Sequence, residues 1–166
     1  MLPRIWFRVA FIALANGCTN KSLAAGKEGC PVTKASDRAF VPPLPYRTMV
    51  GSGGFVVGTP ALWTVIGPHS RVQDLSKLPY FRQGYDWMKD KDPRLTVVAR
   101  RLDGQYPMVW NGWANNGNAS VAGGGGVVFM VTGLDIPAAG CWEIAAHYVP
   151  SPDNIQALTY TVWVEP

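Results

Sequence analysis

The sequence from Cys141 to Val149 (CWEIAAHYV) points to the fold class, because apolar and polar side chains alternate along it. A second run, Leu158 to Val164 (LTYTVWV), alternates in the same way after the connection Pro150 to Gln156. A period of two is typical of antiparallel strands with one buried face, so the two runs predict a hairpin. The residues expected on its buried face are Trp142, Ile144, Ala146, Tyr148, Leu158, Tyr160, Val162 and Val164.

Shorter runs rich in β-branched and aromatic residues precede this hairpin, with turn residues between them. They are Phe55–Val57, Ala61–Ile66, Phe81–Met88 as an edge strand, Leu95–Leu102 and Val127–Thr132. No stretch shows sustained helical periodicity with caps. We therefore predict an all-β fold, an immunoglobulin-like antiparallel β-sandwich of about seven strands. An open barrel is the alternative.

The composition agrees with a single folded domain. The chain has 166 residues, of which 48% are hydrophobic and 16% charged, so it can bury a core. Disordered, collagen-like and coiled-coil classes are excluded on that basis. A net charge of +4 is too small and too scattered to indicate a nucleic-acid partner. Residues 31–60 carry five prolines and a glycine-rich run, which predict extended coil and turns.

Residues 1–17 have the pattern of an export signal. Arg4 and Arg8 precede an uncharged apolar run, Val9–Ala15, which is too short to span a bilayer. A buried first helix is the alternative. The sequence Leu14–Cys18 (LANGC) resembles the lipobox of bacterial lipoproteins, although its leucine stands one place early and Asn16 is unusual. That resemblance implies that Cys18 becomes the lipidated N-terminus.

The cysteine count is consistent with the prediction of a lipoprotein. The chain has three cysteines, an odd number that leaves one unexplained in an exported protein. If Cys18 carries the lipid, Cys30 and Cys141 remain as a disulfide pair; two unpaired buried thiols are the alternative. Residues 18–29 are then a tether, and residues 30–166 the folded domain.

These features predict the location of the protein. We expect it on the outer membrane or cell surface, because Thr19 stands where an aspartate is associated with retention in the inner membrane. The other possibility is cleavage after Ala24 or Ala25, which would give a free periplasmic or secreted protein.

A further resemblance lies in the segment Leu134–Ile144 (LDIPAAGCWEI). It is similar to the corner before the penultimate strand of many bacterial immunoglobulin-like domains. With Cys30–Thr33, Ala61–Val65 and Arg101–Asp103, it resembles a family of uncharacterised bacterial lipoproteins with an immunoglobulin-like sandwich after the signal. The resemblance implies a fold and brings no activity. The long stretch Gln105–Gly126 departs from it.

Signals of enzyme chemistry are sparse. The sequence has none of the nucleophile-elbow, zinc-protease, phosphate-loop or paired-cysteine motifs. His69 and His147 lie far apart, and Glu143, inside a strand, is expected to pair with a base at the surface. We assign no catalytic residue, no metal site and no cofactor.

A blue-copper site is the metal alternative, since Cys141 and His147 share one strand face. It lacks a second nearby histidine and a following methionine.

One segment has a composition suited to recognition. Its candidate binding residues are Trp110, Asn111, Trp113, Asn115 and Asn116. In a flexible loop, two tryptophans could stack on a sugar face while the amides bind its hydroxyls. The alternative is a surface loop whose tryptophans fold back onto the sandwich.

We therefore predict a monomeric, non-catalytic envelope protein that holds a protein, glycan or other envelope component near the membrane. A small-molecule or copper carrier or sensor is the first alternative, and an accessory hydrolase is the second.

Overall fold

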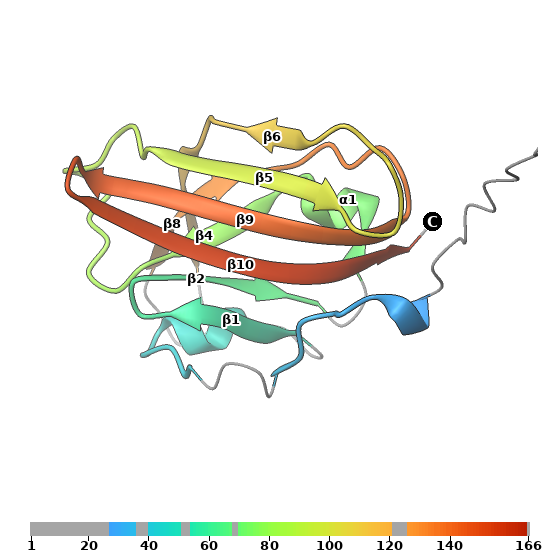
Figure 1. Cartoon of the computed structure of the whole chain (residues 1–166). Coiled ribbons are helices and arrows are strands. Elements are labelled where there is room, and N and C mark those ends of the chain that lie inside the picture. The colour runs from blue at the N-terminus through green and yellow to red at the C-terminus, as the bar shows by residue number, and fades with distance from the viewer. Residues whose placement is uncertain (1–26, 36–39, 51–53, 68–69, 121–125, 166) are drawn as a thin grey trace, which may run out of the picture.

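The computed structural model describes residues 27–35, 40–50, 54–67, 70–120 and 126–165. In these residues, ten strands form two five-stranded sheets that pack face to face as a β-sandwich (Figure 1). The predicted all-β sandwich is therefore confirmed, with more strands than expected. The immunoglobulin-like assignment stays a prediction. The predicted signal and Cys18 lie outside the described residues.

The first sheet has the strand order β1-β2-β4-β8-β7. Its strands are β1 (Phe55–Thr59), β2 (Leu62–Ile66), β4 (Leu78–Phe81), β7 (Asn115–Ser120) and β8 (Gly126–Thr132). The second sheet has the order β3-β10-β9-β5-β6. Its strands are β3 (Ser70–Arg71), β5 (Leu95–Arg101), β6 (Val109–Asn111), β9 (Gly140–Ser151) and β10 (Asn154–Glu165). The short helices are η1 (Lys27–Gly29), η3 (Tyr46–Met49) and α1 (Val72–Leu75).

The β9–β10 hairpin forms as predicted and buries the predicted face. Val162 pairs with Trp142, and Leu158 pairs with Ala146, in an antiparallel ladder. All eight residues expected on the inner face are buried. The loop predicted from Pro150 to Gln156 is wrong, because the strands continue to Ser151 and resume at Asn154. Continued pairing satisfies backbone groups that a longer loop would leave to water.

Two other strand predictions need correction. The predicted edge strand Phe81–Met88 is instead a central strand ending at Phe81, and a turn follows it. Gly84 has a φ of +71°, and Asp86 accepts a hydrogen bond from the backbone N–H of Met88; both features are typical of turns. The stretch Gln105–Gly126 contains β6 and β7 rather than only a flexible loop.

The main core lies between the sheets, where Trp142, Tyr80 and Tyr160 are among the largest buried side chains. A second apolar cluster lies on the outer face of the first sheet, around Trp63, Phe81 and Phe129. Phe40 and Tyr46 pack edge-on against Trp63, with ring centroids 5.2 and 5.6 Å away. The proline-rich segment before β1 therefore covers the outer face of the first sheet.

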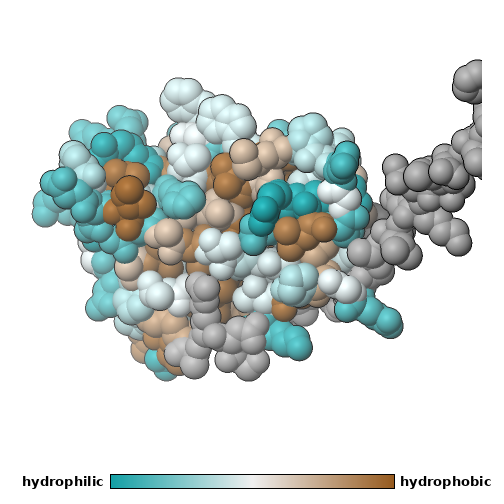
Figure 2. All heavy atoms as spheres, in the orientation of Figure 1, coloured by the Kyte–Doolittle hydropathy of each residue, from teal (hydrophilic) through white to brown (hydrophobic). Residues whose placement is uncertain are grey.

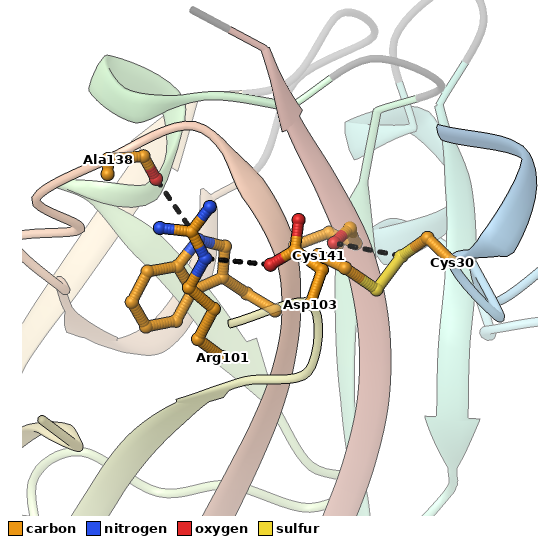
Figure 3. Close-up of polar contacts among 7 residues, drawn as sticks. Cys30, Arg101, Asp103, Ala138 and Cys141 are labelled. Atoms are coloured by element: carbon orange, nitrogen blue, oxygen red, sulfur yellow. Dashed lines mark hydrogen bonds and ion pairs between the residues drawn. A yellow bond between two sulfur atoms is a disulfide. The ribbon is translucent and has the colours of Figure 1, made fainter. Parts of the chain in front are cut away.

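The N-terminal segment is attached to the second sheet in two ways. Cys30 forms a disulfide with Cys141 at the start of β9, as predicted (Figure 3). Thr33 donates its backbone N–H to the carbonyl of Thr161, and its hydroxyl oxygen accepts the N–H of Thr161. β3 pairs only with Val164 and Glu165 of β10. The bonds from Thr33 satisfy backbone groups of Thr161 on the same edge of β10, which would otherwise be unpaired.

Candidate functional site

Apolar side chains gather along one edge of the sandwich. Ten large apolar side chains of the described residues are exposed, and five of them fall between residues 102 and 113. We call these five the tryptophan edge: Leu102, Tyr106, Met108, Trp110 and Trp113. Met108 precedes and Trp110 lies on β6, the edge strand of the second sheet, and Trp113 lies in the turn before β7, the edge strand of the first. Leu102 and Tyr106 lie in the connection from β5 to β6, where the Tyr106 ring packs edge-on against Trp142 at 5.9 Å. The edge strands β6 and β7 of the two sheets therefore lie on the same side of the sandwich.

Trp110, on β6, is 65% exposed. It pairs with Val98 of β5, so its side chain stands on the outer face of the second sheet. Its indole ring lies against the backbone of Gly112, where an added Cβ would be 2.6 Å from the ring carbon Cζ3. Only a glycine at that position leaves the ring where it is.

Trp113 is 81% exposed, although its backbone is bonded on both sides. Its N–H donates to Oδ1 of Asn111 at 2.9 Å, and its carbonyl accepts the hydroxyl of Thr132 at 2.8 Å. The amide nitrogen of Asn111 donates to the carbonyl of Gly133 at 2.9 Å. The turn is therefore tied to both sheets, and the alternative in which the tryptophans fold back onto the sandwich does not describe it.

The five predicted binding residues do not form one cluster of free groups. Trp110, Trp113 and Asn115 are exposed, whereas the amide of Asn111 donates to the carbonyl of Gly133 and accepts the N–H of Trp113. The amide of Asn116 donates to the carbonyls of Asp90 and Lys91, and its oxygen accepts the hydroxyl of Tyr85. Two of the amides expected to bind sugar hydroxyls thus serve the fold.

The sequence carries a further signal at this edge, which is a run without charged residues rather than a motif. From Gly104 to Leu134 it has no Asp, Glu, Lys, Arg or His. This run includes β6 and β7, the edge strands on this side of both sheets. Proteins commonly protect edge strands with charges, so an uncharged, aromatic edge marks a surface suited to contact with something else.

The outer face of the second sheet is more mixed. Figure 2 shows hydrophobic patches separated by hydrophilic side chains over β5, β9 and β10. A row of paired residues crosses it from Trp110 through Val98 and Ala145 to Thr159. Beside that row, Arg100 and Glu143 form an ion pair at 2.8 Å, as expected for Glu143.

A polar cleft of about 330 Å³ lies at the end of the sandwich that holds the 82–93 turn. The hydroxyl of Tyr148 donates to Oδ2 of Asp90 at 2.5 Å, and the guanidinium of Arg82 stands 5.6 Å from the centre of the Tyr148 ring. Burial, reinforced by the bond to Asp90, raises the pKa of Tyr148 to about 12. Burial likewise raises the pKa of Tyr85.

Both phenols in this cleft stay protonated near neutral pH and act as hydrogen-bond donors rather than bases. The hydroxyl of Tyr148 bonds to Asp90 in the 82–93 turn. Tyr85, which belongs to this turn, bonds through its hydroxyl to Asp90 and to Asn116 of β7. These hydrogen bonds therefore fix the 82–93 turn to β7 and β9, which is a structural role.

The residues considered for copper do not come together. The sulfur of Cys141 is bonded to that of Cys30, so no thiolate is left there to bind copper. His147 is exposed on β9, and His69 lies outside the described residues. Among the described residues, no three His, Cys, Asp or Glu side chains lie close enough to hold a metal ion.

The end of the sandwich at Cys141 is tightly bonded (Figure 3). Nε of Arg101 donates to Oδ1 of Asp103 at 2.7 Å, and the indole N–H of Trp142 donates to the carbonyl of Ala138 at 3.1 Å. The N–H of Leu102 donates to the carbonyl of Cys141 at 2.8 Å. The first residue of the tryptophan edge is thus bonded directly to a disulfide cysteine.

In the described part of the chain, no helix is long and apolar enough to cross a membrane. The chain matches no family model, and comparisons with curated proteins and with solved structures find no similar protein. The resemblance to a lipoprotein family stays a prediction.

Proposed function

We propose that this chain is an exported, lipid-anchored binding module of the bacterial envelope, with an immunoglobulin-like sandwich and no catalytic role. The observation that carries the proposal is the exposure of Trp110 and Trp113 on a turn held by hydrogen bonds to both sheets. Large exposed aromatic side chains on a rigid support are typical contact residues, because little conformational entropy is lost when they bind.

The strand order supports the immunoglobulin-like assignment. In chain order, β2, β4, β7 and β8 occupy the places of strands A, B, D and E in one sheet. In the other sheet, β5, β9 and β10 occupy the places of strands C, F and G. β1, β3 and β6 are then additions at the sheet edges.

Export is supported by the disulfide and by the N-terminal sequence. A disulfide between residues 111 positions apart persists in an oxidising compartment and is rare in the cytosol. With Cys30 and Cys141 joined, Cys18 is left as the third cysteine, next to the lipobox-like residues. The proposed role is to hold an envelope component close to the membrane through the tryptophan edge.

Two measurements test this function. Native mass spectrometry of the protein released from bacterial membranes should show a chain that starts at Cys18 and carries an acyl-sized mass increment. The double variant Trp110→Ala/Trp113→Ala should lose co-sedimentation with isolated membranes, peptidoglycan or outer-membrane glycolipid, measured after removal of the anchor by Cys18→Ser.

The matched control is Trp87→Ala, which removes another exposed tryptophan, on the turn at the opposite end of β5. An unlipidated chain that starts near Ala25 would contradict the anchor. Equal sedimentation of the double variant and the control would contradict the binding surface.

A further inference from the structure

We propose that the partner of the tryptophan edge is the bilayer itself: in the anchored protein the edge rests in the lipid headgroup region and sets the orientation of the sandwich. This inference rests on the proposed function, for which it names the envelope component.

The covalent connection brings the edge to the membrane. The tether joins the domain at Cys30, which is bonded to Cys141, and Cys141 accepts the N–H of Leu102. In Figure 1, η1 and the connection from β5 to β6 lie at the same end of the sandwich. The tether therefore enters beside the start of the tryptophan edge.

The reach of the tether matches the length of the domain. Cys18 precedes Cys30 by 12 positions, which covalent geometry limits to about 40 Å. The longest strands, β9 and β10, have 12 residues each and so extend roughly 40 Å. Any part of the edge can therefore reach the surface in which the lipid is embedded.

The chemistry of the edge suits the interface between lipid and water. Tryptophan and tyrosine concentrate there because their rings are apolar while the N–H or O–H still needs a polar partner. Leu102 and Met108 add purely apolar surface. The run without charged residues begins at Gly104, so the edge from there onward carries no charge of its own, and the nearest charges on the same face, Arg100 and Glu143, are paired with each other at 2.8 Å. The charges just before it, Arg101 and Asp103, are paired with each other.

The hydrogen bonds of the edge favour lipid over a sugar ligand. A sugar site needs side-chain donors and acceptors directed at the hydroxyls. Here the amides of Asn111 and Asn116 are bonded inside the protein. Of the three predicted asparagines, Asn115 alone is exposed beside the rings of Trp110 and Trp113, so the outward surface requires burial more than directional bonding.

The test uses the chain from Cys18 onward, with the Cys30–Cys141 disulfide formed and the thiol of Cys18 coupled to a maleimide lipid. This attachment reproduces the tether whether or not a cell lipidates Cys18. The protein is placed on vesicles of phosphatidylethanolamine and phosphatidylglycerol that contain lipids brominated near the headgroup. Bromine quenches tryptophan emission only at short range, so the measurement reports which indoles enter the bilayer.

We expect strong quenching of the parent protein and loss of more than half of it in Trp110→Phe/Trp113→Phe. The control Trp87→Phe should keep the parental quenching. Near-ultraviolet circular dichroism and the mass of the disulfide-bonded chain verify that the variants are folded.

Equal quenching in the double variant and the parent, or none in either, would overturn the inference. The edge would then be assigned to a protein partner. The native mass at Cys18 decides the anchor independently, so failure of the bilayer contact is distinguishable from failure of the proposed function.

Discussion

Tyr80 of β4 and Tyr160 of β10 meet across the sandwich, with their hydroxyl oxygens 3.1 Å apart in the core. Each hydroxyl comes from a different sheet, so the bond also sets how the two sheets face one another. Burial raises the pKa of both phenols, so both are protonated near neutral pH.

Removing both hydroxyls of this pair should cost less stability than the sum of the two single removals. Tyr80→Phe or Tyr160→Phe leaves the other hydroxyl buried without a partner, at a cost of about 1–3 kcal/mol each. The double variant leaves no unsatisfied group, so its loss should be smaller than the sum of the single losses. Urea unfolding of the four proteins measures this, and strictly additive losses would show that the hydroxyls are independent.

The disulfide should be a major source of stability. It joins residues 111 positions apart, and closing so long a loop is worth about 4–5 kcal/mol in the chain-entropy account. We expect Cys30→Ser/Cys141→Ser, or addition of a reductant, to lower the unfolding temperature sharply. The parent and the double variant should have the same stability in reductant. An oxidised parent no more stable than the reduced one would contradict the prediction.

Asp103 should make stability sensitive to acid. Burial alone would raise the pKa of this carboxyl, but hydrogen bonds from Arg101 and from the backbone N–H of Cys141 lower it below its usual value. A pKa that is lower in the folded state stabilises the protein above the unfolded value of about 3.9, and this contribution disappears as pH falls through the folded value.

The variant Asp103→Asn should therefore unfold more easily at pH 7 and lose less stability than the parent between neutral pH and acid. Its control is Asp153→Asn, in the exposed β9–β10 turn. The measurement is the free energy of unfolding in urea as a function of pH. Parallel pH profiles for the parent and Asp103→Asn would show that another carboxyl is responsible.

Gly112→Ala should move the ring of Trp110 with little effect on stability. The added Cβ would come within 2.6 Å of the ring, which must turn away because it is the end of an exposed side chain. We expect a changed rate of acrylamide quenching of Trp110, read as the difference between each protein and its Trp110→Phe counterpart. Gly126→Ala, where no atom lies within 4 Å of the new Cβ, is the control and should match the parent.

Strands with one buried face could be predicted from local sequence in this protein, whereas a strand buried on both faces could not. The β9–β10 hairpin was predictable because only one of its faces is buried, so polar residues alternate with apolar ones. β4 was misplaced because three of its four residues, Leu78, Tyr80 and Phe81, are buried and its fourth is Pro79. A strand with apolar clusters on both faces has no alternation to detect.

β7 could not be predicted from its own residues. Its sequence, NNGNAS, holds no β-branched or aromatic side chain and is typical of a loop. It becomes a strand because all six residues pair with β8. Gly117 leaves room for the ring of Phe129, which an added Cβ would approach to 2.6 Å. Tertiary pairing overrides local preference at this edge.

The sequence by itself determined the all-β class and the buried face of the last hairpin, because alternation is readable without knowing what lies nearby. It indicated Cys141 as the partner of Cys30 only on the assumption that Cys18 carries a lipid, and the tertiary structure shows the pair. Only the tertiary structure decided that Asn111 and Asn116 serve the fold while Trp110 and Trp113 remain exposed. Exposure and hydrogen-bond partners depend on which distant segments pack together. Here β6 pairs with β5 and β7 with β8, and no local pattern encodes that arrangement.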